Sequence, residues 1–337
     1  MPELNTETRK ILKNVKPTAD TNLQYAEGTL ALIDPEFILK IPCKLGKTEF
    51  SVRAVEIIRE CKALRMADTL TINVREKEVS VVSKGKKEKI LKLDKQPIVE
   101  LPKTDKKESF TLDEYVMTIF EDLNTYTKET PLIPSMIFVG FDGDTFQSRN
   151  LAAQYTWEPG NKEAWKTPFS FVPEPLKMIK GLFKKGFEVF VEDAWIVFEK
   201  EDLQFLLRKH EKVGNNVETD SDGMEPFDVE FLVDSALLKK IITEEVNKIP
   251  TMTDRRWLVP ARFVDGKVWI GEEPVAYAKL PVNCKISAQC LQTVIDGNYV
   301  WFYRTLNDEC VELIECEQHG KELILLKQRA AVANGER

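Results

Sequence analysis

The sequence predicts an α+β fold in which one small unit, made of a strand, an amphipathic helix and three further strands, is repeated along the chain. Two observations support this fold class. A complete unit can be followed between Thr48 and Asp94, and its first step, a strand that leads into an amphipathic helix, returns at intervals of about 60 residues. Regular self-similarity on this scale is typical of repeat architectures. The opening strands lie around Phe50, Phe110, Phe171 and Phe231, with a shorter version around Ile286.

The unit between Thr48 and Asp94 shows both of the hydrophobic periods that such a fold requires. Apolar residues recur at three-residue steps from Val55 to Leu64, which places them on one stripe of a helix. Short alternating or apolar runs bounded by polar turns follow, and these are typical of strands. The unit is too small to bury a stable core alone, so it must pack against its neighbours. We expect a helix at 55–64 and strands at 48–52, 69–74, 79–82 and 90–93.

The repeat also predicts the domain organisation. Six units fit within the 337 residues, and pairing them gives three similar domains. Any α+β protein contains strand-to-helix steps, but the order inside these units, with three strands after each helix, favours a repeat. Stretches rich in proline or turn-forming residues mark the boundaries. We expect domains at 1–104, 105–212 and 227–330, with a flexible linker at 213–226.

The remaining elements follow from the same signals. The first helix, at 5–15, has a capping residue at Asn5 or Thr6 and stops before Pro17. A helix that starts at Pro173 and closes with Gly186 uses the common pairing of start and stop residues. Further helices are expected at 113–126, 234–248 and 288–295. Strands are expected at 22–26, 29–33, 37–41, 137–141, 145–157, 187–191, 195–198, 203–207, 256–264, 267–270, 275–280, 299–305, 310–316 and 322–327.

The composition excludes several classes of protein. A net charge of -7 argues against a protein that coats nucleic acid over its whole surface, although local basic stripes are compatible with it. The sequence contains neither the apolar core of a signal peptide nor a run of the ~20 apolar residues that span a membrane. We therefore expect a soluble, cytoplasmic protein. None of the six cysteines forms a CxxC pair, and we expect most of them to be buried small hydrophobic residues.

No set of residues points to catalysis or to a cofactor. The two histidines, His210 and His319, are expected at the end of a strand and in a turn, and they make a poor catalytic or metal pair. The nucleotide-binding patterns GxGxxG and GxxxxGK are absent. The segment ETDSDG, within the predicted linker, lacks the spaced ligands and final glutamate of a calcium loop. We expect neither an enzyme nor a bound cofactor.

Basic stripes on the predicted helices are the strongest functional signal. Arg9, Lys13 and Lys16 are spaced so that they share one face of the first helix. A second stripe follows from Lys177 to Lys184, opposite the apolar stripe of its helix. Solvated surface lysine is the ordinary interpretation of one such stripe. Their recurrence in equivalent helices of the repeat favours contact with phosphate groups, which requires cations but no base-specific side chain.

The layout resembles that of the bacterial-type sliding clamps, the β subunit of replicative DNA polymerase. The stretch IPCK followed by FSVRAVEIIRECKAL, a strand pair and SKGKKEKILKLD resembles the second half of that family's first domain. The stretch FDGDTFQSRNLAAQ resembles the strand pair before the family's client pocket, and ELILLKQ resembles its closing strand. Departures include the family's Thr-Asp-Gly-His-Arg-Leu run, which here reads Gln147 to Leu151, and ten residues after Lys327. Such divergence would suit a clamp encoded by a phage or a mobile element.

The resemblance implies a DNA-clamp fold of three similar domains, with helices lining a central hole and antiparallel sheets outside. It also implies a head-to-tail ring of two chains on duplex DNA, acting as processivity factor for a polymerase, with the polymerase and the clamp loader binding through short peptide motifs. A scaffold of the same fold that does not encircle DNA is the alternative. The expected DNA-binding residues are Arg9, Lys10, Lys13, Lys16, Arg53, Arg59, Lys177, Lys180, Lys184, Lys185, Lys239 and Lys240. The expected partner-binding residues are Arg149, Leu151, Leu323, Ile324 and Leu325.

Overall fold

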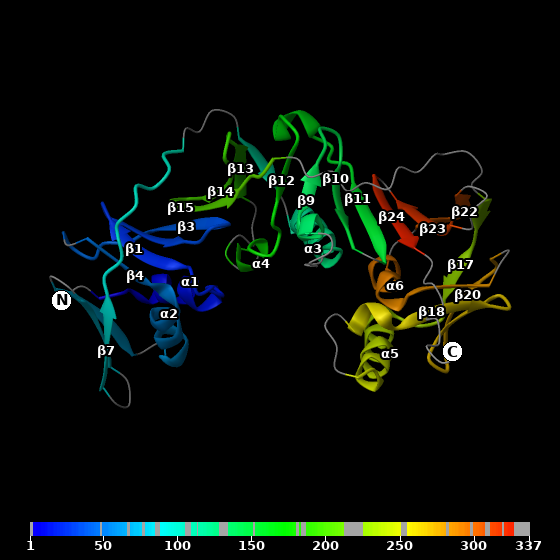
Figure 1. Cartoon of the computed structure of the whole chain (residues 1–337), viewed down its shortest axis with the longest axis horizontal. Coiled ribbons are helices and arrows are strands. Elements are labelled where there is room, and N and C mark those ends of the chain that lie inside the picture. The colour runs from blue at the N-terminus through cyan, green and yellow to red at the C-terminus, as the bar shows by residue number, and fades with distance from the viewer. Residues whose placement is uncertain are drawn as a thin grey trace, which may run out of the picture. The chain divides into compact units, whose positions relative to one another are not determined.

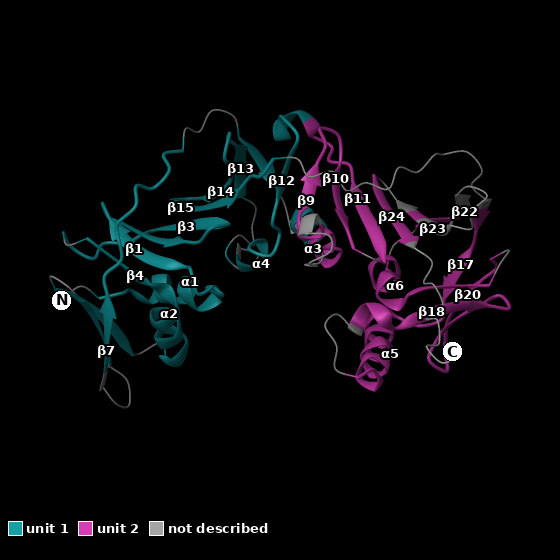
Figure 2. Ribbon diagram, viewed as in Figure 1, with its two compact units in different colours: residues 1–121, 163–211 teal, residues 122–162, 212–337 magenta. Residues whose placement is uncertain are grey.

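The computed structural model contains six α-helices and four β-sheets among the residues that it describes (Figure 1). Their contacts group the chain into two compact units, residues 1–121 with 163–211 and residues 122–162 with 212–337 (Figure 2). The structure describes residues 3–47, 49–65, 68–75, 78–84, 88–104, 109–112, 114–127, 134–150, 152–179, 182, 187–211, 225–250, 255–280, 283–296, 299–306, 311–318 and 320–326.

The first unit is built on one long antiparallel sheet. Its order is β4-β1-β2-β3-β15-β14-β13-β8, so that strands from two distant parts of the chain meet where β3 pairs with β15. Ile38, Phe190, Val197 and Leu206 form a buried apolar cluster in this sheet, and Leu101 packs against it. The strands are β1 (Asn22–Ala26), β2 (Thr29–Ile33), β3 (Phe37–Pro42), β4 (Phe50–Arg53), β8 (Phe110–Leu112), β13 (Phe187–Val191), β14 (Trp195–Lys200) and β15 (Leu203–Arg208).

A separate three-stranded sheet and the helices complete this unit. The small sheet has the order β5-β6-β7, formed by Thr69–Val74, Glu78–Lys84 and Glu88–Asp94. The helix α2 (Ala54–Ala63) directly follows β4 and buries Ile57, Ile58 and Cys61 against the rest of the unit. The other elements are α1 (Thr6–Asn14), the short helix α4 (Leu176–Ile179) and β12 (Phe169–Phe171).

The second unit contains the other long sheet, whose strands follow the order β9-β10-β11-β24-β23-β22-β16. Here β11 pairs with β24, again joining two distant parts of the chain. These strands are β9 (Val139–Phe141), β10 (Phe146–Arg149), β11 (Ala153–Trp157), β16 (Glu225–Phe227), β22 (Val300–Leu306), β23 (Val311–Gln318) and β24 (Lys321–Leu326).

A five-stranded sheet and two helices complete the second unit. The sheet has the order β17-β20-β19-β18-β21, formed by β17 (Val229–Phe231), β20 (Glu273–Ala278), β19 (Lys267–Ile270), β18 (Pro260–Val264) and β21 (Cys284–Ser287). The helices are α5 (Ser235–Lys248) and α6 (Ala288–Val294), with the 3-10 turns η1 (Pro134–Ile137) and η3 (Arg255–Leu258). The Asp234 carboxylate caps α5 by accepting the Leu237 N–H at 2.7 Å, as expected at a helix start.

Aromatic residues link the helices and the long sheet within the second unit. Tyr126, just after α3 (Glu114–Thr125), is fully buried and lies parallel to the Tyr155 ring of β11, with ring centroids 5.6 Å apart. Its hydroxyl group is 2.6 Å from that of Thr293 on α6, and its ring lies 5.6 Å from that of Trp257. Burial raises the pKa of Tyr126 well above its ordinary value. The side chain therefore fixes the end of α3 against both α6 and β11.

Most predicted elements are present within one to three residues of the expected bounds, including the helices at 5–15, 55–64, 113–126, 234–248 and 288–295. Four predictions were wrong in part. The strands expected at 137–141 and 256–264 begin at Val139 and Pro260, because 134–137 and 255–258 form 3-10 turns. The strand expected at 145–157 is two strands, Phe146–Arg149 and Ala153–Trp157. The linker expected at 213–226 ends early, because β16 occupies Glu225–Phe227.

The helix expected from Pro173 also differs. Residues 173–175 are not helical, and α4 begins at Leu176. Pro175 is the physical reason, because the residue before a proline is disfavoured in the helical region. Residues 180, 181 and 183–186 of this predicted helix lie outside the described residues. The division into three domains stays a prediction. Among the residues described, no helix is long and apolar enough to cross a membrane.

The role of Tyr126 can be tested by two substitutions. We expect Tyr126→Phe to cost about 1 to 2 kcal/mol of unfolding free energy, because it removes one buried hydrogen bond. Tyr126→Ala should cost about 3 to 5 kcal/mol, because it also leaves a cavity beside Tyr155. Urea unfolding monitored by tryptophan fluorescence measures both values. Tyr115→Phe, at a residue that is 53% exposed, is the matched control and should change stability by less than about 0.5 kcal/mol.

Candidate DNA and partner interfaces

The first helix, α1, carries the first of the predicted basic stripes. Its start is fixed by the Asn5 side chain, which accepts the Thr8 N–H at 2.7 Å. The helix ends at Asn14, and Pro17 follows shortly after. Leu12 is fully buried, and α1 packs against α2. The basic residues of α1 that lie away from this buried side of the helix reach solvent.

Two cations of this stripe are directed at the end of α2 rather than at solvent. Arg9 is only 4% exposed, and its Nη1 donates to the carbonyl oxygen of Arg65 at 3.4 Å. Lys13 Nζ donates to the carbonyl oxygen of Leu64 at 2.6 Å. Lys62 of α2 does the reverse, since its Nζ donates to the carbonyl oxygen of Val15 at 2.9 Å. Each helix thus supplies a cation to the other's C-terminal carbonyl groups, where the helix dipole is negative.

This reciprocal capping corrects the expectation that Arg9 is an exposed residue. Nothing in the spacing of Arg9, Lys13 and Lys16 distinguishes a phosphate contact from a helix cap. The signal that sequence reasoning missed is the lysine in the last turn of both helices, Lys13 in α1 and Lys62 in α2.

Other predicted DNA-binding residues are exposed. Lys10 and Lys16 on or beside α1, and Arg59 on α2, lie at the surface of the first unit. Arg53 lies 3.8 Å from Asp20 and Lys177 lies 2.6 Å from Glu174. Lys239 and Lys240 are exposed on α5 in the second unit, with Lys240 3.9 Å from Glu244. Exposed pairs of this kind are weak, so these cations can exchange partners. Lys180, Lys184 and Lys185 lie outside the described residues.

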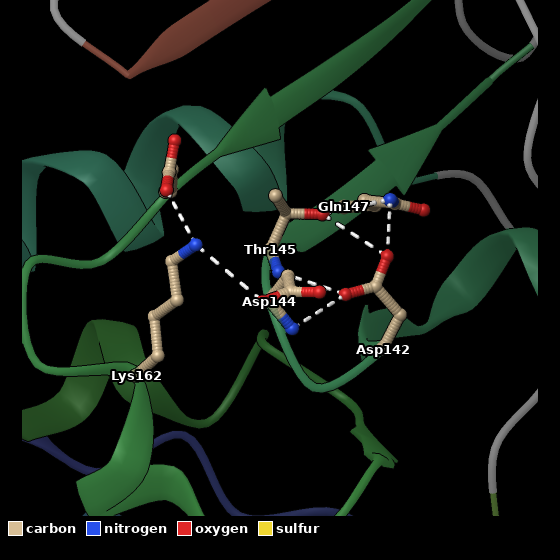
Figure 3. A network of polar contacts seen from close by, with 6 residues as sticks. Asp142, Asp144, Thr145, Gln147 and Lys162 are labelled. Atoms are coloured by element: carbon tan, nitrogen blue, oxygen red, sulfur yellow. Dashed lines mark hydrogen bonds and ion pairs between the residues drawn. The ribbon is translucent and has the colours of Figure 1, made fainter.

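The predicted partner-binding residues that the structure describes lie on β10 and β24, and a polar network fixes the start of β10 (Figure 3). The Asp142 carboxylate accepts the N–H groups of Asp144 and Thr145 at 2.9 and 2.8 Å. It also accepts from the Gln147 side chain at 2.8 Å. Lys162 bridges Asp144 and Glu158 beside this turn. These contacts fix the turn between β9 and β10, and they hold Gln147 in place at the beginning of β10.

A second turn separates β10 from β11. The Asn150 side-chain oxygen accepts the N–H groups of Ala152 and Ala153, at 2.8 and 2.9 Å. This arrangement is a side-chain turn of the kind that asparagine favours. It places Arg149 at the end of β10 and Gln154 directly opposite on β11. Leu151, the other predicted residue of this segment, lies outside the described residues.

Strand register separates the predicted partner-binding residues onto two faces of this sheet. Arg149 is opposite Gln154, and Gln154 is opposite Ile324, so the three form one row across β10, β11 and β24. Neighbouring rows alternate between faces, so Leu323 and Leu325 lie on the other face. There Leu323 is opposite Tyr155, and both leucines are fully buried. Leu323 and Leu325 are thus core residues in this structure, and Ile324 is buried on the opposite face, so none of the three is exposed to a partner here.

The face that carries Arg149 is chemically mixed. It consists of Gln147, Arg149, Gln154, Thr156, Glu322 and Ile324, which we call the β10–β24 face. Ile324 is 1% exposed and Gln154 is 5% exposed, whereas Arg149 is half-buried. Burial lowers the pKa of Arg149 from its ordinary value, because the guanidinium group loses hydration there. Sequence reasoning missed Gln154 and Thr156, although the alternation of β11 would have placed them beside Arg149.

The described residues contain no cluster of three or more histidine, cysteine or acidic side chains able to hold a metal ion. His210 lies 2.7 Å from the Glu36 carboxylate, and its backbone pairs with Ser170. His319 lies outside the described residues. The five cysteines that are described are buried, as expected. Burial raises the pKa of Cys61 to about 11, so its thiol stays protonated at neutral pH.

The likeness to known proteins is seen in three dimensions and not in sequence. No protein-family model and no curated protein matches the sequence. The solved structure of the DNA polymerase III β subunit from Pseudomonas aeruginosa superposes with a TM-score of 0.62 at 12% identity, over 97% of this chain and 99% of that one. The Pseudomonas aeruginosa sliding clamp bound to griselimycin gives 0.63, and the Helicobacter pylori β clamp bound to a DNA ligase peptide gives 0.64, both at 12% identity and the same coverage. The chain has the sliding-clamp fold over almost its whole length.

The reciprocal capping of α1 and α2 gives a stability prediction. We expect Lys13→Met and Lys62→Met each to lower the unfolding free energy by about 1 to 2 kcal/mol, because each removes a cation from a helix C-terminus while keeping the apolar stem. Denaturant unfolding measures the change. Lys10→Met, on the exposed side of α1, is the control and should stay within about 0.5 kcal/mol of the parent. Equal effects of all three substitutions would show that the caps contribute nothing specific.

Proposed function

We propose that this protein is a sliding clamp, a non-enzymatic processivity factor that encircles duplex DNA and tethers a replicative DNA polymerase. The observation that carries the proposal is the match of nearly the whole chain to sliding clamps, 97% of its length and 99% of theirs. A match to one domain alone would show only that this domain is shared with sliding clamps. Agreement over the entire repeat supports an assembly of the same kind, because ring closure depends on every domain in order.

In this proposal retention on DNA is topological. Two chains of three domains each form a head-to-tail ring, and heterologous contacts of this type close into a ring when the rotation per domain allows it. The exposed cations on the helices, such as Lys10, Arg59 and Lys239, contact phosphate groups without reading bases. The chain is acidic overall, so its surface as a whole does not hold DNA, and the duplex can slide through the ring. Escape requires the ring to open.

The second candidate function is a clamp-fold scaffold that binds replication or transcription factors without encircling DNA. The burial of Arg9 favours it, since one cation of the predicted DNA-facing stripe is used inside the protein. The two functions differ in one measurable property. A ring is retained on circular DNA and slides off linear DNA, whereas a scaffold treats both alike.

We further propose that the polymerase and the clamp loader bind by short peptides at the β10–β24 face. The Helicobacter pylori relative was solved with a DNA ligase peptide, which supports peptide recognition by this fold. For this chain the half-buried Arg149 is the residue we assign to an acidic group of the peptide, because a guanidinium group binds a carboxylate through strong, charge-assisted hydrogen bonds. Leu151 is proposed to contact the peptide's apolar anchor.

Retention on DNA gives the first test of function. After loading, we expect the protein to stay on nicked circular DNA through gel filtration in high salt and to leave the same DNA once it is linearised. The mass in solution should be near twice 38.7 kDa by light scattering. Equal retention on both forms of DNA would favour the scaffold.

The helix cations can be tested by charge removal in the same assay. Replacing Lys10, Lys16, Arg59 and Lys239 with alanine should weaken binding to duplex DNA and reduce the salt dependence. The slope of the logarithm of the binding constant against the logarithm of the salt concentration should fall in magnitude by roughly 0.9 for each phosphate group that the variant no longer neutralises. The matched control removes four exposed cations from strands and loops, namely Lys44, Lys47, Lys103 and Lys285. If both sets change the slope equally, the helices have no special role.

The peptide site can be tested at Arg149. We expect Arg149→Ala to weaken binding of a fluorescent peptide from the cognate polymerase tail by about 10 to 100-fold, as for other central charged contacts. Arg208→Ala, an exposed arginine of the first unit, is the control. Light scattering should show an unchanged mass for both variants. Full peptide affinity in folded Arg149→Ala would show that the peptide binds elsewhere.

A further inference from the structure

The two long sheets follow a common pairing rule. In the first unit the join is made by β3 and β15, and in the second unit by β11 and β24. Each of these four strands is the last of the three that follow a helix of the repeat, namely α1, α4, α3 and α6. The joins contain four and five residue pairs respectively. Third strands of the repeat therefore pair with one another, in antiparallel ladders.

Two third strands remain, and they differ in what covers them. β7, after α2, is the last strand of its sheet and among the described residues pairs only with β6. Residues 90–94 of β7 are all at least partly exposed, and Ile90 is 59% exposed. β20, after α5, pairs with β19 on one side and with β17 on the other. The edge of β20 that corresponds to the joins elsewhere is thus covered by the chain itself.

The covering strand is short and lightly packed. β17 pairs with β20 through three residues, Val229 to Phe231, and one more bond runs from the Leu232 N–H to the Val275 carbonyl oxygen at 2.9 Å. Val229 and Phe231 are only half-buried, and Leu232 is 44% exposed. β8 and β17 hold equivalent positions in the repeat, directly before α3 and α5. β8 pairs with β13, the first strand after the next helix of the repeat. The equivalent pairing in the second unit, with β22, is made by β16 and not by β17.

We propose that β17 is a self-capping strand that competes with β7 of a second copy of this chain for the edge of β20. An open edge invites pairing with other chains, and proteins commonly cover such edges. The second copy is the occupant that the structure supports, because β7 is the one other third strand whose outer edge pairs with no strand among the described residues. β7 has seven residues and β20 has six, so their ladder can reach the length of the two internal joins. This inference rests on the proposed ring. It adds that β17 must detach from β20 before the ring can close.

Locking β17 in place tests the competition. Glu230 and Tyr277 are opposite each other on β17 and β20, and both side chains are exposed. Directly opposed residues bring their Cβ atoms near the spacing that a disulfide needs. We expect Glu230→Cys/Tyr277→Cys to stay near 38.7 kDa when oxidised, at concentrations where the parent dimerises, and to dimerise after reduction. The native cysteines that the structure describes are buried, so they do not compete with the added pair.

Weakening β17 should have the opposite effect. The Leu232 N–H points to β20, and so does that of Glu230 two residues earlier in the strand. Glu230→Pro removes this donor, and we expect it to lower the dimer dissociation constant about tenfold relative to Glu230→Ala. Analytical ultracentrifugation measures both, with circular dichroism as the check on folding.

The outcomes separate this inference from the function on which it rests. If the oxidised lock dimerises as tightly as its reduced form, β17 does not compete and the self-capping proposal is overturned, while the ring stands. If the parent, the reduced lock and Glu230→Pro all remain monomeric at high micromolar concentration, both the ring and this inference fail. A monomeric oxidised lock that dimerises on reduction supports both.

Discussion

Antiparallel pairing between third strands of the repeat is the constraint on which the rest of this structure depends. In each strand-helix-strand-strand-strand segment of the repeat, the third strand after the helix has one outer edge whose N–H and carbonyl groups need a partner. β3 with β15, and β11 with β24, satisfy them by joining segments that lie far apart in the sequence. The long sheets follow from these two ladders, and so do the compact units, each of which contains one of the ladders. The remaining third strands are β7 and β20, of which β20 is covered by β17, and our proposal places assembly with a second chain at these two strands.

The basic residues show how one residue type serves two purposes in such a fold. Lys13 and Lys62 neutralise the carbonyl ends of neighbouring helices, and Arg9 is buried beside them. Their exposed neighbours on the same helices, such as Lys10 and Arg59, remain available for phosphate groups. A protein with more acidic than basic residues can thus present cations on its helices while using others to hold those helices together. Cations on rigid helices suit a surface that must hold DNA without reading it.

The β10–β24 face depends on the β11–β24 ladder in the same way. Arg149 and Ile324 are 175 positions apart in the sequence, yet Gln154 connects them in one row of the sheet. The Asp142 network and the Asn150 turn fix both ends of β10, so the row has a defined register. A candidate peptide site is therefore supported by elements that also form the core, since Leu323 and Tyr155 pair on the opposite face.

The sequence by itself determined the repeat, the positions of most helices and strands and the resemblance to sliding clamps, because these depend on local hydrophobic periods and turn residues. Alternation along β24 would also have separated Ile324 from Leu323 and Leu325. Only the tertiary structure decided which strands join, that Arg9 and Lys13 cap α2, and that Glu225 to Phe231 forms two strands on different sheets. The physical reason is that pairing partners and helix-end contacts are set by residues far away in the chain, which spacing along the sequence does not record.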